Sequence, residues 1–174
     1  MLPINIIVNH NALSALGNGF APARAGERPL LIGGGVGVPP LYGLCRNLIE
    51  AGARPIVILG FNTEREVFYK EEFEKLGTEV LVATADGSMG QKGFVTDVLR
   101  NIKEPATFFY TCGPEPMLKA LDKALPEGLE GEMSFEERMG CGFGACMGCS
   151  CETRYGAKRI CKDGPVLERS EILW

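Results

Sequence analysis

Four cysteines near the C-terminus stand at a spacing suited to metal ligation. They follow the pattern C-x4-C-x2-C-x11-C, as Cys141, Cys146, Cys149 and Cys161. The first three match the plant-type ligand run of a [2Fe–2S] cluster, in which the fourth thiolate arrives from further along the chain. Glycines interleave with these cysteines and let backbone N–H groups approach the sulfurs of an anionic cluster. The segment therefore predicts a [2Fe–2S] site with these four ligands.

Two other uses of the cysteines were weighed. Structural zinc usually pairs two short C-x2–4-C arms, whereas here only one such arm is present and Cys161 stands alone, so zinc remains an open alternative. A disulfide framework is disfavoured because the chain has seven cysteines, an odd number, and shows no secretory segment. Cys151 breaks the ligand spacing and is interpreted as a small buried residue or a spare thiol.

A second candidate site is a glycine-rich turn. Gly33, Gly34, Gly35 and Gly37 follow a short apolar run and precede a helical pattern that begins at Pro39. A strand, a glycine turn and a helix N-terminus together can bind the pyrophosphate of a dinucleotide. A tight turn without a ligand remains the alternative, because a short glycine pattern is weak evidence on its own.

Apolar segments alternate with helical patterns along most of the chain. This alternation predicts an α/β fold with a five-stranded parallel nucleotide-binding sheet and a small C-terminal Cys-rich [2Fe–2S] module. The expected strands cover residues 30–32, 55–59, 79–83, 107–110 and 132–136. The expected helices cover residues 39–51, 64–76, 94–101 and 115–125, and residues 4–8 could form one further strand. The expected units are the remnant of a domain junction with a linker at 1–28, the nucleotide-binding domain at 29–137 and the cluster module at 138–174.

The ends of the expected strands should meet at one edge of the sheet. Ligands of such sheets bind beyond the carboxyl ends of the strands, which brings Cys112 next to the glycine turn. Cys112 has two interpretations, a small residue that ends a buried strand or a neighbour of a bound nicotinamide, and the residues alone slightly favour the first. His10, the single histidine, is interpreted as a surface or turn residue.

Composition limits the partners and the compartment. The chain has 174 residues, of which 45% are hydrophobic and 23% charged, as in a globular protein. A formal net charge of −4 gives no reason to expect nucleic acid as a partner. No apolar run is long enough for a membrane span, and the N-terminus lacks the basic region of a signal peptide. Ligating thiols need a reducing compartment, so the expected location is cytoplasmic.

Four motifs together resemble one family. They are L-G-N-G-F, G-G-G-V-G-V-P-P-L-Y, Y-T-C-G-P-E-P-M-L and S-F-E-E-R-M-G-C-G-F-G-A-C-M-G-C, the last followed by C-K-D-G-P-V. In order and spacing they resemble the electron-transfer subunit of type B dihydroorotate dehydrogenase, in the ferredoxin–NADP reductase superfamily. The resemblance covers nearly the whole chain, and its last two motifs are the specific ones.

The resemblance implies an electron path in pyrimidine biosynthesis. NADH reduces FAD, and single electrons pass through the [2Fe–2S] cluster to FMN in a separate catalytic subunit, within a heterotetramer. It implies three groups of residues besides the cluster cysteines. Those at the NAD pyrophosphate are Gly33, Gly34, Gly35, Gly37 and Pro40; those at the nicotinamide are Cys112, Gly113 and Pro114, with Cys112 as the catalytic residue; those near the flavin are Gly17, Asn18, Gly19 and Phe20.

One departure from the family pattern concerns the flavin domain. The family has an N-terminal FAD-binding β-barrel with an R-x-[YF]-[ST] signature, which is absent from this sequence, and only 32 residues precede the glycine turn. The sequence therefore predicts that most of the barrel is missing and that the chain alone binds FAD weakly. Two alternative functions remain, an electron-transfer subunit of a ferredoxin-dependent NAD(P) reductase and a non-catalytic module with a four-cysteine zinc site.

Overall fold

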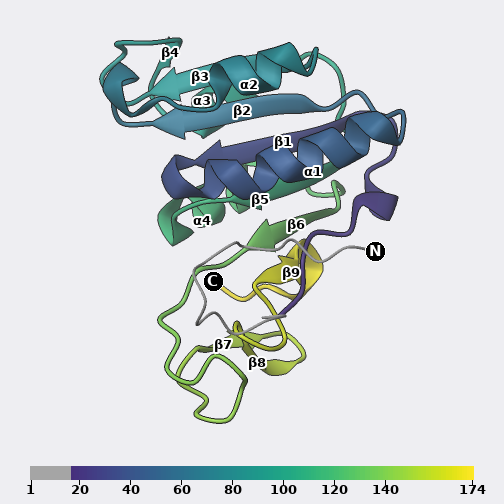
Figure 1. Ribbon diagram of the computed structural model, residues 1–174, viewed down its shortest axis with the longest axis vertical. Helices are drawn as coiled ribbons and strands as arrows, with labels where there is room; N and C mark the ends of the chain where they lie inside the picture. The colour runs from purple at the N-terminus through teal and green to yellow at the C-terminus, as the bar shows by residue number, and fades with distance from the viewer. Residues whose placement is uncertain (1–16) are drawn as a thin grey trace, which may run out of the picture.

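The apolar segments lie side by side as strands in the computed structural model, which describes residues 17–174 (Figure 1). Residues 4–8 and His10 lie outside this range. None of the helices within it is long and apolar enough to span a membrane. With 3-10 helices labelled η, the elements are η1 (Pro22–Arg24), β1 (Pro29–Gly34), η2 (Gly35–Gly37), α1 (Val38–Glu50), β2 (Ile56–Phe61), η3 (Glu64–Glu66), α2 (Lys70–Lys75), β3 (Glu79–Thr84), β4 (Gln91–Lys92), α3 (Val95–Leu99), β5 (Phe108–Cys112), α4 (Glu115–Ala124), β6 (Gly131–Ser134), β7 (Ser150–Thr153), β8 (Gly156–Arg159), β9 (Val166–Glu168) and η4 (Arg169–Glu171).

The main sheet has the strand order β4-β3-β2-β1-β5-β6-β9. The five strands from β3 to β6 pair in parallel, so the predicted five-stranded parallel sheet is confirmed. Two short strands extend it, because β4 adds in parallel beside β3 and β9 adds antiparallel beside β6. The order reverses between β1 and β5, and such a switch point opens a ligand-binding crevice at the carboxyl ends of the two strands.

Helices cover both faces of the sheet, which explains why the central strands β1 and β2 are apolar and buried almost along their whole length. Successive side chains of β1 point to opposite faces. Leu31 belongs to the core formed with α1 and α2, together with Leu41 and Phe73. Ile32 belongs to the core formed with α3 and α4, together with Leu118. Figure 1 shows α1 and α2 in front of the sheet.

The expected helix over residues 64–76 is wrong. The structure has η3, an extended stretch and then only the short α2, and Tyr69 at their junction has a left-handed backbone with φ of 64°. Aromatic packing accounts for the interruption. The ring of Phe68 lies 5.3 Å from that of Phe61, and the ring of Tyr69 lies 5.1 Å from that of Tyr42. These contacts with the core outweigh the local helical pattern of the sequence.

The sequence analysis missed the strands of the C-terminal part. Strands β7 and β8 form an antiparallel hairpin beside the cysteine loop. The chain then returns to the main sheet as β9, where Val166 lies opposite Ser134 of β6. The final segment also contacts the hairpin, through a β-bridge between Ile172 and Thr153 and an ion pair between Glu171 and Lys158. The cysteine region is therefore attached to the sheet at both of its ends.

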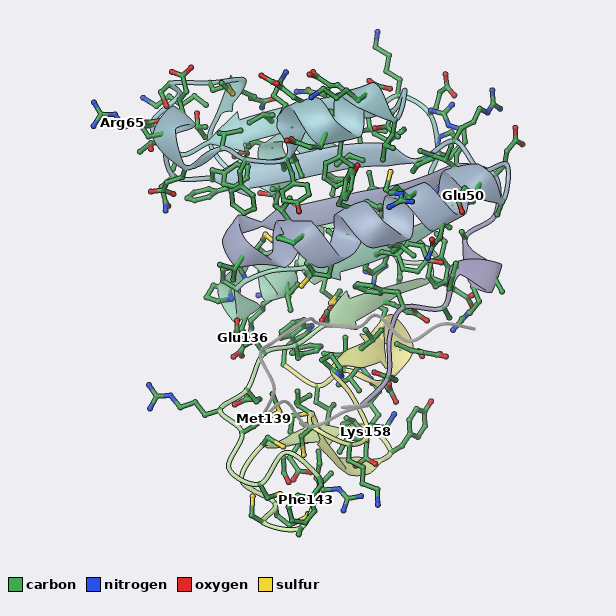
Figure 2. All side chains as sticks on the ribbon, viewed as in Figure 1. Glu50, Arg65, Glu136, Met139, Phe143 and Lys158 are labelled. Atoms are coloured by element: carbon green, nitrogen blue, oxygen red, sulfur yellow. The ribbon has the colours of Figure 1, made fainter. Side chains whose placement is uncertain are left out.

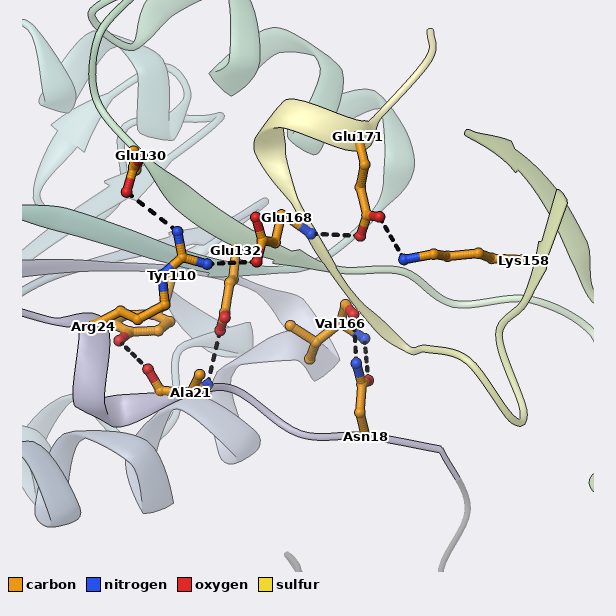
Figure 3. A network of polar contacts seen from close by, with 10 residues as sticks. All are labelled: Asn18, Ala21, Arg24, Tyr110, Glu130, Glu132, Lys158, Val166, Glu168 and Glu171. Carbon is orange, nitrogen blue, oxygen red and sulfur yellow. Dashed lines mark hydrogen bonds and ion pairs between the residues drawn. The ribbon is translucent and has the colours of Figure 1, made fainter. Parts of the chain in front are cut away.

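An asparagine ties the start of the described chain to this returning segment (Figure 3). The Asn18 amide donates to the Val166 carbonyl at 2.8 Å and accepts the Val166 N–H at 2.9 Å. Gly17 has a φ of 60° and lies directly against the Gly164 carbonyl, where a Cβ would overlap that oxygen. Glycine is thus required there by both backbone conformation and space.

The same segment continues across β5 and β6. The Ala21 N–H donates to the buried Glu132 carboxylate at 2.9 Å, and the Ala21 carbonyl accepts the Tyr110 hydroxyl at 2.8 Å. Arg24 pairs with Glu168 of β9 at 2.6 Å. Burial raises the pKa of Glu132, while the hydrogen bond from Ala21 and the charge of Arg24 oppose that rise. These contacts form a strap over the strands that precede and follow the cysteine loop.

Replacing Asn18 with alanine is expected to lower the free energy of unfolding by about 1–2 kcal/mol, because two half-buried hydrogen bonds to Val166 are lost. Urea unfolding followed by circular dichroism would measure this loss. Asn47→Ala is the matched control, since Asn47 is exposed on α1 and alanine favours the helix. Equal stabilities of the two variants would contradict a stabilising role for the Asn18 contacts.

Candidate functional site

The glycine turn lies at the carboxyl end of β1, on one side of the switch point. The chain passes from β1 through η2 into α1 without a side chain that caps the helix. Gly35 has a φ of 51°, and apart from its two chain neighbours no atom of residues 17–174 lies within 4 Å of the position of a Cβ there. Pro39 and Pro40 occupy the first turn of α1 and carry no N–H, so donors for an anion must come mainly from the turn itself.

The end of β5 forms the other side of the crevice. Gly33 lies opposite Cys112 in the sheet, and a Cβ on Gly37 would overlap the Cys112 carbonyl. Gly113 and Pro114 then lead into α4. The structure therefore brings the predicted glycines of the turn and the residues 112–114 together at one edge.

Met117 is a residue of this edge that the sequence analysis missed. Its side chain fills the space over two of the predicted glycines: a Cβ on Gly34 would lie 2.5 Å from the Met117 sulfur, and a Cβ on Gly113 would overlap its methyl group. The only signal in the sequence was its place in the first turn of the expected helix after Pro114. Glycine at both positions lets the two strand ends approach under this side chain.

Cys112 is half-buried at the crevice. Burial raises the pKa of its thiol, a hydrogen bond with Ser134 opposes the rise, and the nearby charge of Glu136 adds to it. The thiol is therefore neutral at pH 7, which suits contact with a planar apolar ring better than nucleophilic attack. The catalytic role predicted for Cys112 remains a prediction.

The four residues predicted near a flavin lie on the strap. Asn18 contacts Val166, Gly17 contacts Gly164, and the Phe20 ring stands edge-on to the Tyr110 ring at 5.5 Å between centroids. Gly19 is exposed between them. These residues thus join the returning C-terminal segment to β5, and their flavin contact stays a prediction.

The four cysteines of the ligand pattern stand as two pairs in the loop between β6 and β7 and in the turn after β8. The Cys141 sulfur accepts the N–H groups of Ala145 at 3.3 Å and of Cys146 at 3.4 Å. The Cys149 sulfur accepts the N–H of Cys161 at 3.4 Å. The first pair is accessible at the surface, whereas the second is buried.

The surroundings of Cys141 favour the thiolate form that binds iron, whereas burial and the neighbouring Cys149 raise the pKa of Cys161. Backbone N–H groups, those of Cys146 first and Phe143 next, lower the pKa of Cys141 to about 6. Gly142 and Gly144 have φ values of 73° and 86°, so the loop curls in a way that most side chains disfavour. Across residues 17–174, no group of three or more histidine, cysteine or carboxylate side chains is arranged to hold a metal ion. The structure therefore keeps the four cysteines as two separate pairs, and together they are the donor set of a two-iron cluster, which takes four cysteines.

Cys151 belongs to neither pair. It lies in β7, half-buried against the apolar core, and burial raises the pKa of its thiol.

The cysteine loop itself forms one end of the molecule, and Figure 2 shows Phe143 at that end and Arg65 at the opposite one. Phe143 and Met139 expose 64% and 50% of their surface, so the loop has an apolar exterior.

Comparison with known families defines the class of this protein. Residues 31–123 match the family model of the oxidoreductase NAD-binding domain, and residues 136–173 match that of the iron–sulfur cluster binding domain of dihydroorotate dehydrogenase B. The first match spans more than half of the chain, which therefore belongs to the oxidoreductase NAD-binding domain family. The two matched regions coincide with the glycine-turn edge and the cysteine region.

Particular relatives narrow this class. The chain is 48% identical over 170 residues to the dihydroorotate dehydrogenase B (NAD(+)) electron transfer subunit of Geobacillus sp. (strain WCH70), with 94% of this chain and 65% of that protein covered. It is also 48% identical over 168 residues to the subunit of the same name from Lysinibacillus sphaericus (strain C3-41), with 93% and 65% covered. The resemblance inferred from the motifs is confirmed, and the chain spans about 65% of the length of these relatives.

Solved structures agree with this placement. A chain of the NADH-dependent reduced ferredoxin-NADP oxidoreductase superposes with a TM-score of 0.82 at 32% identity, covering 93% of this chain and 59% of that one. The cytochrome b5 reductase domain of Ulva prolifera nitrate reductase superposes with a TM-score of 0.51 at 23% identity, covering 63% and 48%. The second likeness concerns the fold alone.

Proposed function

We propose that this chain passes electrons from NADH, through flavin and a [2Fe–2S] cluster, to the catalytic subunit of a type B dihydroorotate dehydrogenase. One observation supports this most directly. Cys112 at the crevice lies opposite Ser134, the last residue of β6, and the chain runs from Ser134 straight into the cysteine loop. The connection from Ser134 to Cys141 spans at most about 25 Å even when fully extended. The nucleotide edge and the cluster cysteines are thus joined by one short segment.

Each group of residues has a role in this proposal. The turn of Gly33, Gly34, Gly35 and Gly37, with Pro40 behind it, binds the pyrophosphate through its backbone. Cys112, Gly113 and Pro114 hold the nicotinamide against the end of β5, and Cys112 excludes water there as a neutral thiol. Gly17 to Phe20 lie on the flavin side of the strap. Bound flavin and a [2Fe–2S] cluster would together supply the conversion of one two-electron hydride into single electrons.

The cysteines hold the cluster at the end of the molecule farthest from β4. The accessible pair, Cys141 and Cys146, faces the surface, whereas Cys149 and Cys161 anchor the site in the core. An acceptor can therefore approach from the side of the first pair. The acceptor in this proposal is an FMN-containing catalytic subunit within a heterotetramer, and thiolate ligation suits a reducing compartment, the cytoplasm. The nucleotide-binding unit (29–137) and cluster module (138–174) remain the proposed divisions.

A second candidate has its own observation. The likeness to the reduced ferredoxin-NADP oxidoreductase chain extends over 93% of this chain, including the cysteine region. An electron-transfer subunit that serves a ferredoxin-dependent reductase would use the same two sites with a different partner. The two candidates differ only in what accepts or supplies electrons at the cluster.

The visible absorption spectrum of the purified chain tests the proposal. A [2Fe–2S] protein is red-brown and contains iron and acid-labile sulfide in equal amounts, whereas a four-cysteine zinc site is colourless. Reduction of the cluster after mixing with a dihydroorotate dehydrogenase B catalytic subunit and dihydroorotate would then favour the first candidate. Reduction only by reduced ferredoxin would favour the second. A colourless zinc-containing chain would exclude both.

We also expect NADH to bind at least about fivefold more tightly than NADPH. The segment after β2 carries Glu64 and Glu66 against a single Arg65, and an added 2′-phosphate beside a carboxylate in water loses about 1 kcal/mol. Fluorescence titration of the two nucleotides measures the ratio. Glu64→Lys should lower the ratio of NADH affinity to NADPH affinity. Glu50→Lys, at the far end of α1, is the matched control. Tighter binding of NADPH by the unmodified chain would contradict the expectation.

A further inference from the structure

Arg159 links the two segments that carry the cluster cysteines. It ends β8, two residues before Cys161, and a quarter of its side chain is exposed. Its guanidinium donates to both oxygens of Asp163, at 2.9 and 3.3 Å. The remaining nitrogen donates to the Gly144 carbonyl at 2.9 Å. Gly144 lies in the loop between Cys141 and Cys146, so one side chain joins that loop to the turn of Cys161.

The turn that contains Cys161 is itself built around Arg159. The Arg159 carbonyl accepts the N–H groups of Lys162 at 3.0 Å, Asp163 at 2.7 Å and Gly164 at 3.3 Å. The Arg159 N–H donates back to the Asp163 carboxylate at 3.0 Å. Cys161 therefore occupies a position that the backbone of Arg159 defines.

The loop is pressed closely against this turn. Gly144 has a φ of 86°, and a Cβ on it would lie 2.8 Å from the Lys162 side chain and 3.4 Å from the Arg159 guanidinium. A glycine at this point lets the carbonyl of the loop face the arginine. The planar guanidinium can serve Asp163 and Gly144 at once, whereas a lysine ammonium cannot span both with the same geometry.

We propose that Arg159 is a positioning residue for the cluster: its side chain fixes the loop of Cys141 and Cys146 against the turn of Cys161. This inference rests on the proposed function, because it concerns the same four cysteines. The contact also places a positive charge at the loop. A positive charge beside an anionic cluster favours the reduced, more negative state and so raises the reduction potential.

A solvated ion pair without consequence for the loop is the competing explanation. Arg159 and Asp163 are four residues apart and partly exposed, and such pairs usually contribute little. The Gly144 contact separates the two explanations, because an isolated ion pair would leave the order of residues 141–146 unchanged when Arg159 is replaced.

The test compares three variants of the full chain. Arg159→Gln removes both the positive charge and the planar guanidinium that contacts Asp163 and Gly144, whereas Arg159→Lys keeps only the charge. Arg154→Gln is the matched control, because Arg154 lies exposed at the tip of the same hairpin and its side chain makes no hydrogen bond or ion pair with residues 17–174. Two quantities are measured: hydrogen exchange of the Ala145 and Cys146 amides, and the midpoint potential of the cluster by spectroscopic titration.

We expect exchange at these two amides to rise at least about tenfold in Arg159→Gln and in Arg159→Lys, but not in the control. The potential should fall in Arg159→Gln and be largely restored in Arg159→Lys. Exchange and potential equal to those of the Arg154→Gln control would overturn the proposal. Absence of iron from the unmodified chain would refute the proposed function instead, and the exchange measurement would still decide whether Arg159 holds the loop.

Discussion

Replacing Cys149 with serine is expected to abolish the visible absorption of the purified chain, with iron content falling to near zero. The Cys149 sulfur is buried and accepts the N–H of Cys161, so Cys149 belongs to the buried pair of cysteines. A serine hydroxyl at this position is a poor ligand for iron, because the cluster takes thiolates. Visible and electron paramagnetic resonance spectra, with iron and sulfide analysis, measure the loss.

Two further variants separate ligation from folding. Cys151→Ser, in β7, should leave the spectrum largely intact, since Cys151 belongs to neither pair. Cys146→Ser changes an exposed cysteine, so loss of absorption there cannot result from a disturbed core. A chain that keeps its colour as Cys149→Ser and loses it as Cys151→Ser would overturn the ligand assignment.

Replacing Gly37 with alanine should weaken NADH binding by at least about tenfold and lower the free energy of unfolding by about 1–3 kcal/mol. A Cβ at Gly37 would overlap the carbonyl of Cys112, and its three nearest atoms all belong to the backbone of Cys112 and Gly113, so no side chain can rotate away. The turn and the end of β5 would have to separate, which opens the crevice. Nucleotide titration and urea unfolding measure the two effects.

Helix α1, which follows the turn, offers a control of opposite sign. Apart from the backbone of α1 itself, no atom of residues 17–174 lies within 4 Å of a Cβ placed on Gly43, in the middle of α1, and alanine is favoured over glycine in a helix interior. Gly43→Ala should therefore raise the free energy of unfolding by about 0.5–1 kcal/mol and leave NADH binding unchanged. Wild-type affinity and stability in Gly37→Ala would show that the close approach at the crevice is dispensable.

Much of the sheet could be predicted because its strands are continuous apolar runs. Residues 30–32, 55–59 and 79–83 are recognisable as strands by composition. The observed β1 and β3 extend the first and third of them by three residues and one residue, and β2 is displaced toward the C-terminus, to residues 56–61. Strand β9 could not be found this way. It has three residues, and its place depends on pairing with β6 across more than thirty residues of chain.

The candidate site likewise has features that the sequence could predict and features that it could not. Glycine and cysteine patterns are local, so the turn and the ligand set were visible in the sequence. The contacts that shape these sites are not local. Asn18 reaches Val166 across 148 positions, and Arg159 reaches Gly144 across 15. Such pairs leave no periodic signal in the sequence, because each contact forms only when the complete fold brings two distant segments together.

The return of the chain beside β6 makes the cysteine region resemble a cassette. Ser134, where the chain leaves the sheet, lies opposite Val166, where it returns, and the Phe135 N–H donates to the Pro165 carbonyl at 2.9 Å. Opposed residues of antiparallel strands have Cα atoms about 4.5–5.5 Å apart. Residues 135–165 therefore begin and end at neighbouring points of one strand edge. A segment with this geometry could be transplanted onto another exposed edge strand through two adjacent backbone joints, provided that the contacts of Thr153 with Ile172 and of Lys158 with Glu171 are carried along.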